Sequence, residues 1–185
     1  MTLAVGSVAA ALAPAAAASG STTEAATPTL ADRSPGASAG VLASFEGRRI
    51  DLSRDWDGAR SCAVVSPEDV RCYVSNEQAD AALAAAGLTS NVTGETFDDQ
   101  CANGWLCLFD LPNFGGRRLI FQDEGWQSLA GYGFQYKTSS WINNQACDDL
   151  GGLGDGVGGA IYISGCGARA SELGDWDNRA VDVGP

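Results

Sequence analysis

Residues 101–145, CANGWLCLFDLPNFGGRRLIFQDEGWQSLAGYGFQYKTSSWINNQ, constrain the fold of this chain more than any other stretch. They predict a tight turn over 111–116, a later loop with a short helical turn, and three strands over 105–109, 117–121 and 139–143. This succession is typical of a Greek-key motif in a small β-protein. Such proteins more often bind a partner than catalyse a reaction.

Several residues of this stretch have predictable roles in closing a folded hairpin. Phe109 and Phe114 are expected to pack over the sheet, and Gly116 to occupy a position that suits a residue without a Cβ. A hydroxyl group from Ser139 or Ser140 is expected to tie the hairpin down by hydrogen bonds. We therefore assign these residues to the fold and not to a functional site.

The composition excludes several classes of function. The chain of 185 residues has no histidine, which removes the commonest general base, the commonest zinc ligand and every Ser-His-Asp or Cys-His arrangement. A formal net charge of −12 argues against a nucleic-acid groove and against binding to an anionic membrane, since both need clustered Lys or Arg. We interpret the acidity as a property that keeps the protein soluble. The alternative interpretation is that the negative charge attracts Ca²⁺ or a basic partner. We expect no enzymatic activity.

Six cysteines, an even number, predict a framework of disulfides. No C-x-x-C motif occurs, and the absence of histidine makes zinc improbable. Among the roughly 15 connectivities that six cysteines allow, pairing between neighbours in the sequence is the simplest. The expected bridges are Cys62–Cys72, Cys101–Cys107 and Cys147–Cys166. Disulfides belong to an oxidising compartment, so we expect a secreted, extracellular protein.

The N-terminal segment agrees with that destination. Residues 1–18 resemble a signal peptide, with a short apolar run and an A-x-A cleavage site at Ala16 to Ala18, although no Lys or Arg precedes the run. A disordered Ala-rich leader is the alternative. Residues 19–43, rich in Ala, Ser, Thr, Pro and Gly, predict a disordered spacer. No other segment has the length and hydrophobicity of a transmembrane helix.

After the spacer, residues 44–97 predict a small α+β subdomain with a disulfide. A hairpin is expected from 62–65 and 70–74, which places Cys62 and Cys72 near its paired ends. A helix is expected to begin at Ser75, where Ser75 and Gln78 match a capping box, and to end at Gly87.

Residues 98–185 predict a Greek-key domain. Its second half has weaker signals and is expected to repeat the plan of strand, turn, short helical turn and final strand. The halves meet at 148–159, DDLGGLGDGVGG, where glycine gives the backbone wide freedom. We expect this join to be mobile.

The pattern C-x5-C-L-F-x4-F-G-G-R-x-L-x-F followed by S-S-W-I-N-N resembles the secreted actinobacterial proteins grouped with the metalloproteinase inhibitors, peptidase inhibitor family thirty-six. The resemblance implies a mainly β fold, a βγ-crystallin-like Greek-key sandwich, here preceded by the α+β subdomain. It also implies a monomer that binds an extracellular protease, a metalloprotease first of all, through a disulfide-supported loop. One fold hosts many functions, so inhibition is the weaker inference.

Two loops are candidates for the inhibitory contact. An inhibitor gains affinity by presenting a loop that is already rigid in its bound shape. Residues 102–106, between Cys101 and Cys107, are short and expected at a hairpin edge. Residues 148–165 are rich in glycine, which opposes preorganisation. The sequence identifies no scissile bond, and the inhibitory loop stays open.

The resemblance also implies a calcium half-site, and we expect no other cofactor. The βγ-crystallin signature is an Asn/Asp pair, two arbitrary residues and then Ser/Thr-Ser, which suits a hard cation. One copy keeps Ser139 and Ser140 without the acidic pair, and the other keeps Asp177 and Asn178 without the serines. The surviving half-site would combine one residue of each pair. The alternative is that Asp177 and Asn178 only form a turn.

A module that binds cell-wall polymer or another partner is a third reading of the sequence. Trp126, Trp141 and Trp176 would stack on sugars if exposed, and would pack the core otherwise. The enzyme alternative is an acid/base hydrolase that uses one of the carboxylate pairs at 98–99, 123–124 and 148–149. Adjacent residues on a strand point apart, whereas glycoside hydrolysis needs two converging carboxyls.

Overall fold

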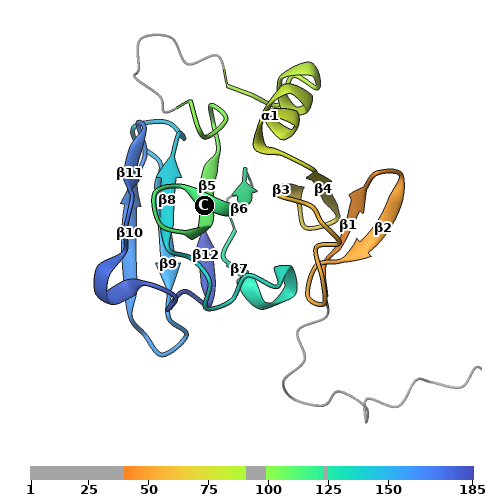
Figure 1. Ribbon diagram of the computed structural model, residues 1–185. Helices are drawn as coiled ribbons and strands as arrows, with labels where there is room; N and C mark the ends of the chain where they lie inside the picture. The colour runs from red at the N-terminus through yellow and green to blue at the C-terminus, as the bar shows by residue number, and fades with distance from the viewer. Residues whose placement is uncertain (1–39, 91–98, 123–124) are drawn as a thin grey trace, which may run out of the picture. The chain divides into compact units, whose positions relative to one another are not determined.

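Short strands make up most of the described chain. The computed structural model describes residues 40–90, 99–122 and 125–185. The N-terminal elements are β1 Leu42–Phe45, β2 Arg48–Asp51, β3 Ser61–Ser66, β4 Asp69–Tyr73 and α1 Asn76–Ala85. The C-terminal elements are β5 Leu106–Leu111, β6 Gly115–Phe121, β7 Gln127–Ser128, η1 Leu129–Tyr132, β8 Ser140–Asn143, β9 Leu150–Gly154, β10 Ala160–Ser164, β11 Ala168–Ala170, η2 Gly174–Trp176 and β12 Asp182–Gly184. The predicted fold class, mainly β, is confirmed (Figure 1).

Some of the expectations fall outside the described residues. These are the signal-peptide-like segment over 1–18, the spacer up to residue 39 and the boundary between 97 and 98, and they stay predictions. The described residues belong to one compact unit. None of their helices has the length and hydrophobicity that crossing a bilayer requires.

An eight-stranded sheet joins the two segments that the sequence separates at residue 97. Its strand order is β11-β8-β5-β6-β3-β4-β1-β2, and β3 pairs with β6 in parallel, with Cys62 opposite Leu119. The predicted β3–β4 hairpin and the following helix are present, but their strands extend the sheet of β5 and β6. A second sheet has four strands in the order β10-β9-β12-β7.

Both faces of the central strand β5 are buried, which explains its run of apolar residues. Successive side chains point to opposite faces of a strand. Leu106 and Leu108 accordingly belong to a core shared with Leu153 of the four-stranded sheet. Cys107 and Phe109 belong to a second core, which includes a leucine from α1. The eight-stranded sheet is therefore covered on one side by the smaller sheet and on the other by the helix.

The β5–β6 hairpin is closed by the residues that the sequence predicts. The rings of Phe109 and Phe114 meet edge to face, with centroids 5.7 Å apart. The backbone of Gly116 has φ of +77°, a conformation that favours glycine. Ser140 Oγ donates a hydrogen bond to the Leu111 carbonyl at 2.7 Å and accepts one from the Phe114 N–H at 3.0 Å. The assignment of these residues to the fold is confirmed.

Helix α1 begins with the predicted cap, although the reciprocal bond differs in detail. Ser75 Oγ accepts a hydrogen bond from the Gln78 N–H at 3.2 Å. The Gln78 side chain accepts from the Val74 N–H at 3.1 Å, one residue before the expected partner. Ala79 and Leu83 form the buried face of the helix. The N-terminal cap thus anchors the helix directly after β4.

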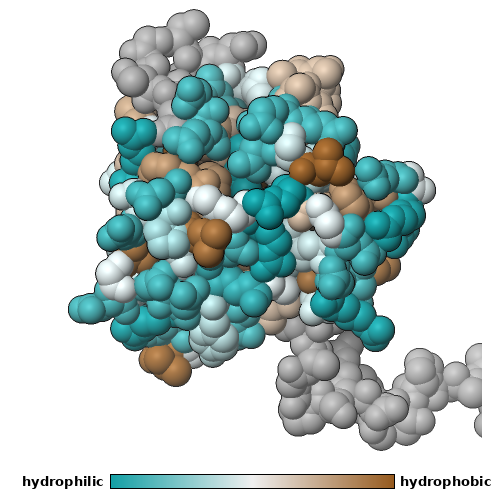
Figure 2. Space-filling model, in the orientation of Figure 1, coloured by the Kyte–Doolittle hydropathy of each residue, from teal (hydrophilic) through white to brown (hydrophobic). Residues whose placement is uncertain are grey.

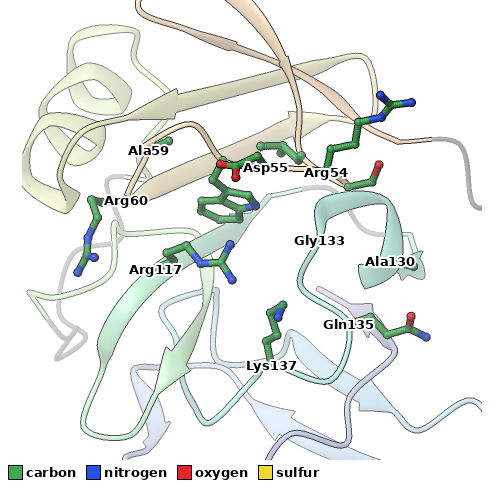
Figure 3. A pocket seen from close by; sticks show the side chains of 13 residues that line it. Arg54, Asp55, Ala59, Arg60, Arg117, Ala130, Gly133, Gln135 and Lys137 are labelled. Carbon is green, nitrogen blue, oxygen red and sulfur yellow. The ribbon is translucent and has the colours of Figure 1, made fainter.

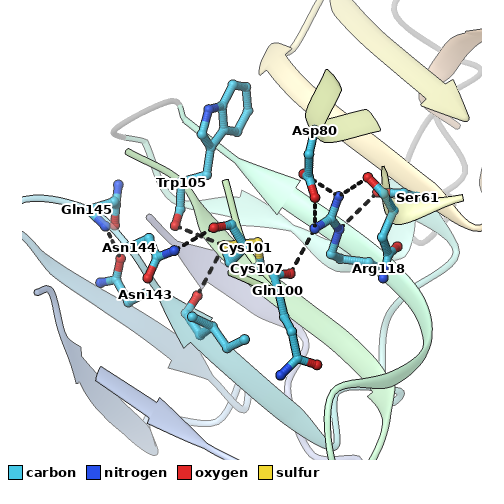
Figure 4. The surroundings of a disulfide bond; sticks show 12 residues. Ser61, Asp80, Gln100, Cys101, Trp105, Cys107, Arg118, Asn143, Asn144 and Gln145 are labelled. Atoms are coloured by element: carbon cyan, nitrogen blue, oxygen red, sulfur yellow. Dashed lines mark hydrogen bonds and ion pairs between the residues drawn. A yellow bond between two sulfur atoms is a disulfide. The ribbon is translucent and has the colours of Figure 1, made fainter. Parts of the chain in front are cut away.

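A buried arginine ties this helix to the sheet (Figure 4). The Arg118 side chain on β6 is fully buried, and its Nη2 and Nη1 lie 2.7 Å and 3.1 Å from the two carboxylate oxygens of Asp80 on α1. Its other donors reach the Ser61 hydroxyl and the Gln100 and Asn76 carbonyls. A guanidinium without water needs this many acceptors to remain buried. Arg118 is therefore the polar junction between the first segment and the Greek-key segment.

The expectation that the join over 148–159 is mobile is wrong for its first half. Residues 150–154 form β9, which pairs with both β10 and β12 inside the four-stranded sheet. Glycine is present there because Trp126 lies on the backbone itself. A Cβ at Gly152 would lie 3.0 Å from Trp126 Cη2, and one at Gly184 would lie 2.8 Å from Cε2. The glycines make room for the indole ring and do not signal a flexible linker.

Candidate functional site

Disulfides fix the framework around the candidate loops. The described cysteines form the three predicted pairs, Cys62–Cys72, Cys101–Cys107 and Cys147–Cys166. The first pair joins directly opposed residues of β3 and β4. The second brings the segment before β5 onto that strand (Figure 4), and the third closes the base of the β9–β10 hairpin. Two of the bridges thus enclose the two loops that were candidates from the sequence.

The loop over 102–106 has little exposed surface that a partner could contact. Trp105 and Leu106 are fully buried, and Ala102 is nearly so. Trp105 Nε1 donates a hydrogen bond to the Leu88 carbonyl at 2.9 Å. The Gly104 N–H donates to the Asn144 carbonyl at 2.8 Å. This loop is largely packed into the core, with residues 103 and 104 half-buried, so it offers little surface to a partner.

The turn of the second candidate loop is held by one carboxylate. Asp155 Oδ1 accepts hydrogen bonds from the Val157 N–H at 3.0 Å and the Gly159 N–H at 2.8 Å. The Asp155 N–H donates to the Gly159 carbonyl at 2.9 Å, which closes the hairpin. Glycine was expected to oppose preorganisation of this loop, yet in residues 155–159 these hydrogen bonds hold the backbone in a defined turn. Local side-chain bonds of this kind specify a turn that glycine alone would leave free.

Electrostatics reinforce the same turn. The hydrogen bond from the Val157 N–H holds the pKa of the Asp155 carboxyl below its ordinary value, and the Gly159 N–H and the Arg179 charge act in the same direction. Arg179 Nη2 lies 3.3 Å from Asp155 Oδ2. Arg179 in turn stacks over the ring of Trp176, 5.0 Å from its centroid. The carboxylate is charged in neutral solution and keeps its acceptor role there.

The tip of this turn exposes a hydrophobic side chain. Val157 is 88% exposed, the largest fraction among the exposed large hydrophobic residues described. The flanking Gly156 and Gly158 have φ of +74° and +100°, so the backbone bends sharply on both sides. Figure 2 shows a hydrophobic projection over the β9–β10 turn with hydrophilic surface around it. We call residues 155–159 the Val157 turn.

A second exposed apolar surface lies on the outer face of the four-stranded sheet. Trp126 is 59% exposed and Tyr162 is 78% exposed, and both line a shallow groove with Leu150, Gly152 and neighbouring residues. The cavity volume of the groove is about 230 Å³. Of the three tryptophans considered for stacking on sugars, Trp141 and Trp176 are partly buried. Trp126 is the one that keeps most of its surface in solvent.

The predicted calcium ligands are brought near each other only through the backbone. The Asn178 N–H donates to the Thr138 carbonyl at 3.0 Å, next to Ser139 and Ser140. Both serines are buried, and the Ser140 hydroxyl is engaged in the hairpin. The side chain of Asn178 donates to Asp177 Oδ2 at 2.9 Å at the surface. No group of three or more acidic, Cys or His side chains among the described residues could hold a metal. The calcium half-site stays a prediction.

Sequence reasoning missed a basic pocket between the first segment and the Greek-key segment (Figure 3). It has a cavity volume of about 580 Å³. Its charged lining residues come from three separate stretches of chain: Arg54, Asp55, Arg60, Arg117 and Lys137. Because these positions are far apart in the sequence, no local motif announces the pocket. The Val157 turn was missed for another reason, since its glycines suggested mobility.

Comparisons with known proteins agree with the sequence motifs. Residues 95–149 match the model of peptidase inhibitor family I36. A βγ-crystallin from Ciona intestinalis is 23% identical over 44% of this chain and 98% of its own, with a TM-score of 0.36. The N-terminal domain of Protein S is 19% identical over 43% of this chain and 92% of its own, with a TM-score of 0.35. No curated protein matches the chain. Over residues 95–149 the chain is thus similar to peptidase inhibitor family I36, as its motifs predict.

Proposed function

We propose that this protein inhibits an extracellular peptidase, a metalloprotease first of all, by presenting the Val157 turn to the substrate cleft of the enzyme. The match to peptidase inhibitor family I36 supports a peptidase as partner. The observation that carries the choice of surface is Val157 itself, a hydrophobic side chain 88% exposed on a hydrogen-bonded turn. The three disulfides fit the oxidising environment in which a secreted peptidase acts. In this function the chain binds the peptidase as a monomer and catalyses no reaction of its own.

The turn has the physical properties that such a contact needs. Ordering a flexible loop costs free energy on binding, and a loop fixed beforehand avoids much of that cost. Here Asp155 fixes the turn, and the Cys147–Cys166 bridge holds the base of the same hairpin. A valine that enters an apolar specificity pocket gains about 1.5–3 kcal/mol from burial. The turn thus offers a rigid backbone and one anchoring side chain.

The test is a titration of the oxidised protein against a thermolysin-type metalloprotease and a subtilisin-type serine protease. The informative variant is Val157→Ala, and Val74→Ala is the matched control because Val74 is also exposed but lies before α1. We expect the inhibition constant for the sensitive enzyme to rise about tenfold in Val157→Ala, since part of the apolar burial is lost. The control should keep the inhibition constant of the parent.

The outcomes separate the parts of the proposal. Equal inhibition by both variants would reject the Val157 turn while leaving an inhibitor that uses another surface. If neither protease is inhibited at a micromolar excess of this protein, the proposed inhibition is rejected for both protease classes. Inhibition of the serine protease alone would reject the metalloprotease as target.

The second candidate function is binding of a cell-wall polymer, favoured by the exposed ring of Trp126. An indole face that is open to solvent and backed by a flat sheet suits stacking against a sugar ring. Tyr162 lines the same groove. Co-sedimentation with purified peptidoglycan would test this function, with Trp126→Ala as the variant expected to lose binding. Retention of full binding by that variant would reject this surface.

A further inference from the structure

The basic pocket is unusual for so acidic a chain. The chain carries a net charge of −12, yet four cationic side chains and one carboxylate line the same cavity of about 580 Å³. Its volume falls within the range of small-molecule sites. Apolar lining is also present, from Leu52, Trp56 and Ala130. The pocket therefore combines positive charge with an apolar wall.

Arg117 is held in a fixed orientation at the pocket. Its Nε donates to Asp110 Oδ2 at 2.7 Å, and its backbone N–H donates to Asp110 Oδ1 at 2.6 Å. The guanidinium carbon Cζ lies 4.7 Å from the centroid of the Trp56 ring and 5.6 Å from that of Phe134. No described residue accepts a hydrogen bond from its two Nη atoms. The two Nη groups form a fork of the kind that binds carboxylate and phosphate oxygens.

Lys137 supplies a second cation and, unlike Arg117, has no carboxylate partner among the described residues. It is exposed and makes no ion pair with any residue that the structure describes. Figure 3 shows Lys137 and Arg117 projecting toward each other, with Arg60 and Arg54 directed toward the rim. Arg54 is already paired with Asp51 at 3.3 Å. The donors that face the cavity are therefore the Nη groups of Arg117, whose charge Asp110 already balances, and the ammonium group of Lys137, which is not ion-paired.

We propose that this pocket binds a small organic oxyanion, a carboxylate or a phosphate ester. The Nη fork of Arg117 takes two oxygens of the anionic group, and Lys137 takes a further oxygen. The carbon skeleton of the ligand rests on the apolar wall beside Trp56. The prior fixation of Arg117 by Asp110 and the aromatic rings lowers the ordering cost of binding. This site is separate from the Val157 turn and does not depend on the inhibitory function.

Isothermal titration calorimetry at constant ionic strength tests the site by measuring the affinity for small anions. The probes are citrate, inorganic phosphate, and one acetylated tripeptide with either a free or an amidated C-terminus. The variant is Lys137→Gln, and Arg49→Gln is the control because it removes the same charge from an exposed position on β2 outside the pocket. We expect saturable binding that weakens about tenfold in Lys137→Gln and stays within about twofold in Arg49→Gln.

Each outcome decides the proposal or its chemistry. If citrate binds, or if the tripeptide binds with a free C-terminus but not with an amidated one, the ligand is a carboxylate. If phosphate is the only probe that binds, the ligand is a phosphate. Absence of saturable binding by every probe overturns the proposal. Equal weakening in Lys137→Gln and Arg49→Gln also overturns it, because the effect would then follow net charge alone.

Discussion

The two sheets use the same kind of strand for opposite purposes. In the eight-stranded sheet, β5 buries large side chains on both faces, and the residues of the recognisable motif are occupied with packing and hairpin closure. In the four-stranded sheet, one face packs on the core while the other carries Trp126 and Tyr162 in solvent. The sheet with the clear sequence motif is therefore the scaffold. The sheet with the weak motif bears the most exposed of the large hydrophobic residues described, which are Val157, Tyr162, Leu150 and Trp126.

Their polar groups differ in the same way. Arg118 is fully buried in the first sheet and has acceptors from both segments of the chain. Asp155, directly after β9 of the second sheet, organises a turn at the surface. Loss of the buried group should destabilise the whole fold, because a buried charge needs its partner. Loss of the surface group should change a local conformation only.

The largest effect is expected from Asp80→Ala. This change removes the carboxylate that neutralises Arg118 and leaves a buried guanidinium unpaired. We expect the free energy of unfolding to fall by about 3 kcal/mol, as for other broken buried ion pairs. Urea unfolding followed by fluorescence measures it. Glu77→Ala is the control, since Glu77 is exposed in the first turn of the same helix. A similar loss in both variants would contradict the role of Arg118 as the junction.

An intermediate effect is expected from Gly184→Ala in the smaller sheet. The new Cβ would lie 2.8 Å from Trp126 Cε2 and 2.9 Å from its Cδ2, so the indole must move off the sheet. We expect a loss of about 1 kcal/mol in stability and a shift of the tryptophan emission, as for other overpacked sites. Gly125→Ala is the matched control, because its Cβ would meet no atom within 4 Å. An unchanged emission spectrum in Gly184→Ala would contradict the contact between the Trp126 ring and the backbone of Gly184.

Local signals predicted the parts of the fold that local interactions determine. The Ser75 cap, the β5–β6 hairpin and the pairing of neighbouring cysteines each depend on residues close in sequence. The parallel pairing of β3 with β6 could not be predicted in this way. It joins residues such as Cys62 and Leu119, and no turn or spacing between them carries a signal.

The candidate site was less predictable than the fold for two physical reasons. Glycine in β9 is disfavoured by strand propensity and is required by contact with Trp126, which precedes it by more than twenty residues. The rigidity of the Val157 turn depends on the Asp155 side chain. Its effect follows from the structure, in which one carboxylate oxygen accepts hydrogen bonds from two backbone N–H groups of the turn. Tertiary contact thus overrides composition in β9, whereas in the turn a local side-chain interaction does so.

The smallest effect is expected from the titration of Asp155, and it is confined to the turn. Its folded pKa lies below the ordinary value of 3.8, because the charged form accepts the Val157 and Gly159 N–H groups and faces Arg179. The contribution of Asp155 to stability is therefore complete above pH 3.8 and is lost as the pH falls through the lower folded pKa. The amide chemical shifts of Val157 and Gly159 should move in that acidic range and stay constant from there to neutral pH.

Asp155→Asn distinguishes this cause from general acid unfolding. The amide oxygen of asparagine can still accept both backbone hydrogen bonds, but it does not become protonated in this range. The variant should therefore keep the turn and lose the pH dependence of the two amide shifts. If the shifts of Val157 and Gly159 move equally with pH in the variant, then the turn is not governed by the charge of Asp155. The rigidity that makes Val157 presentable would in that case have to come from the β9–β10 pairing and the Cys147–Cys166 bridge alone.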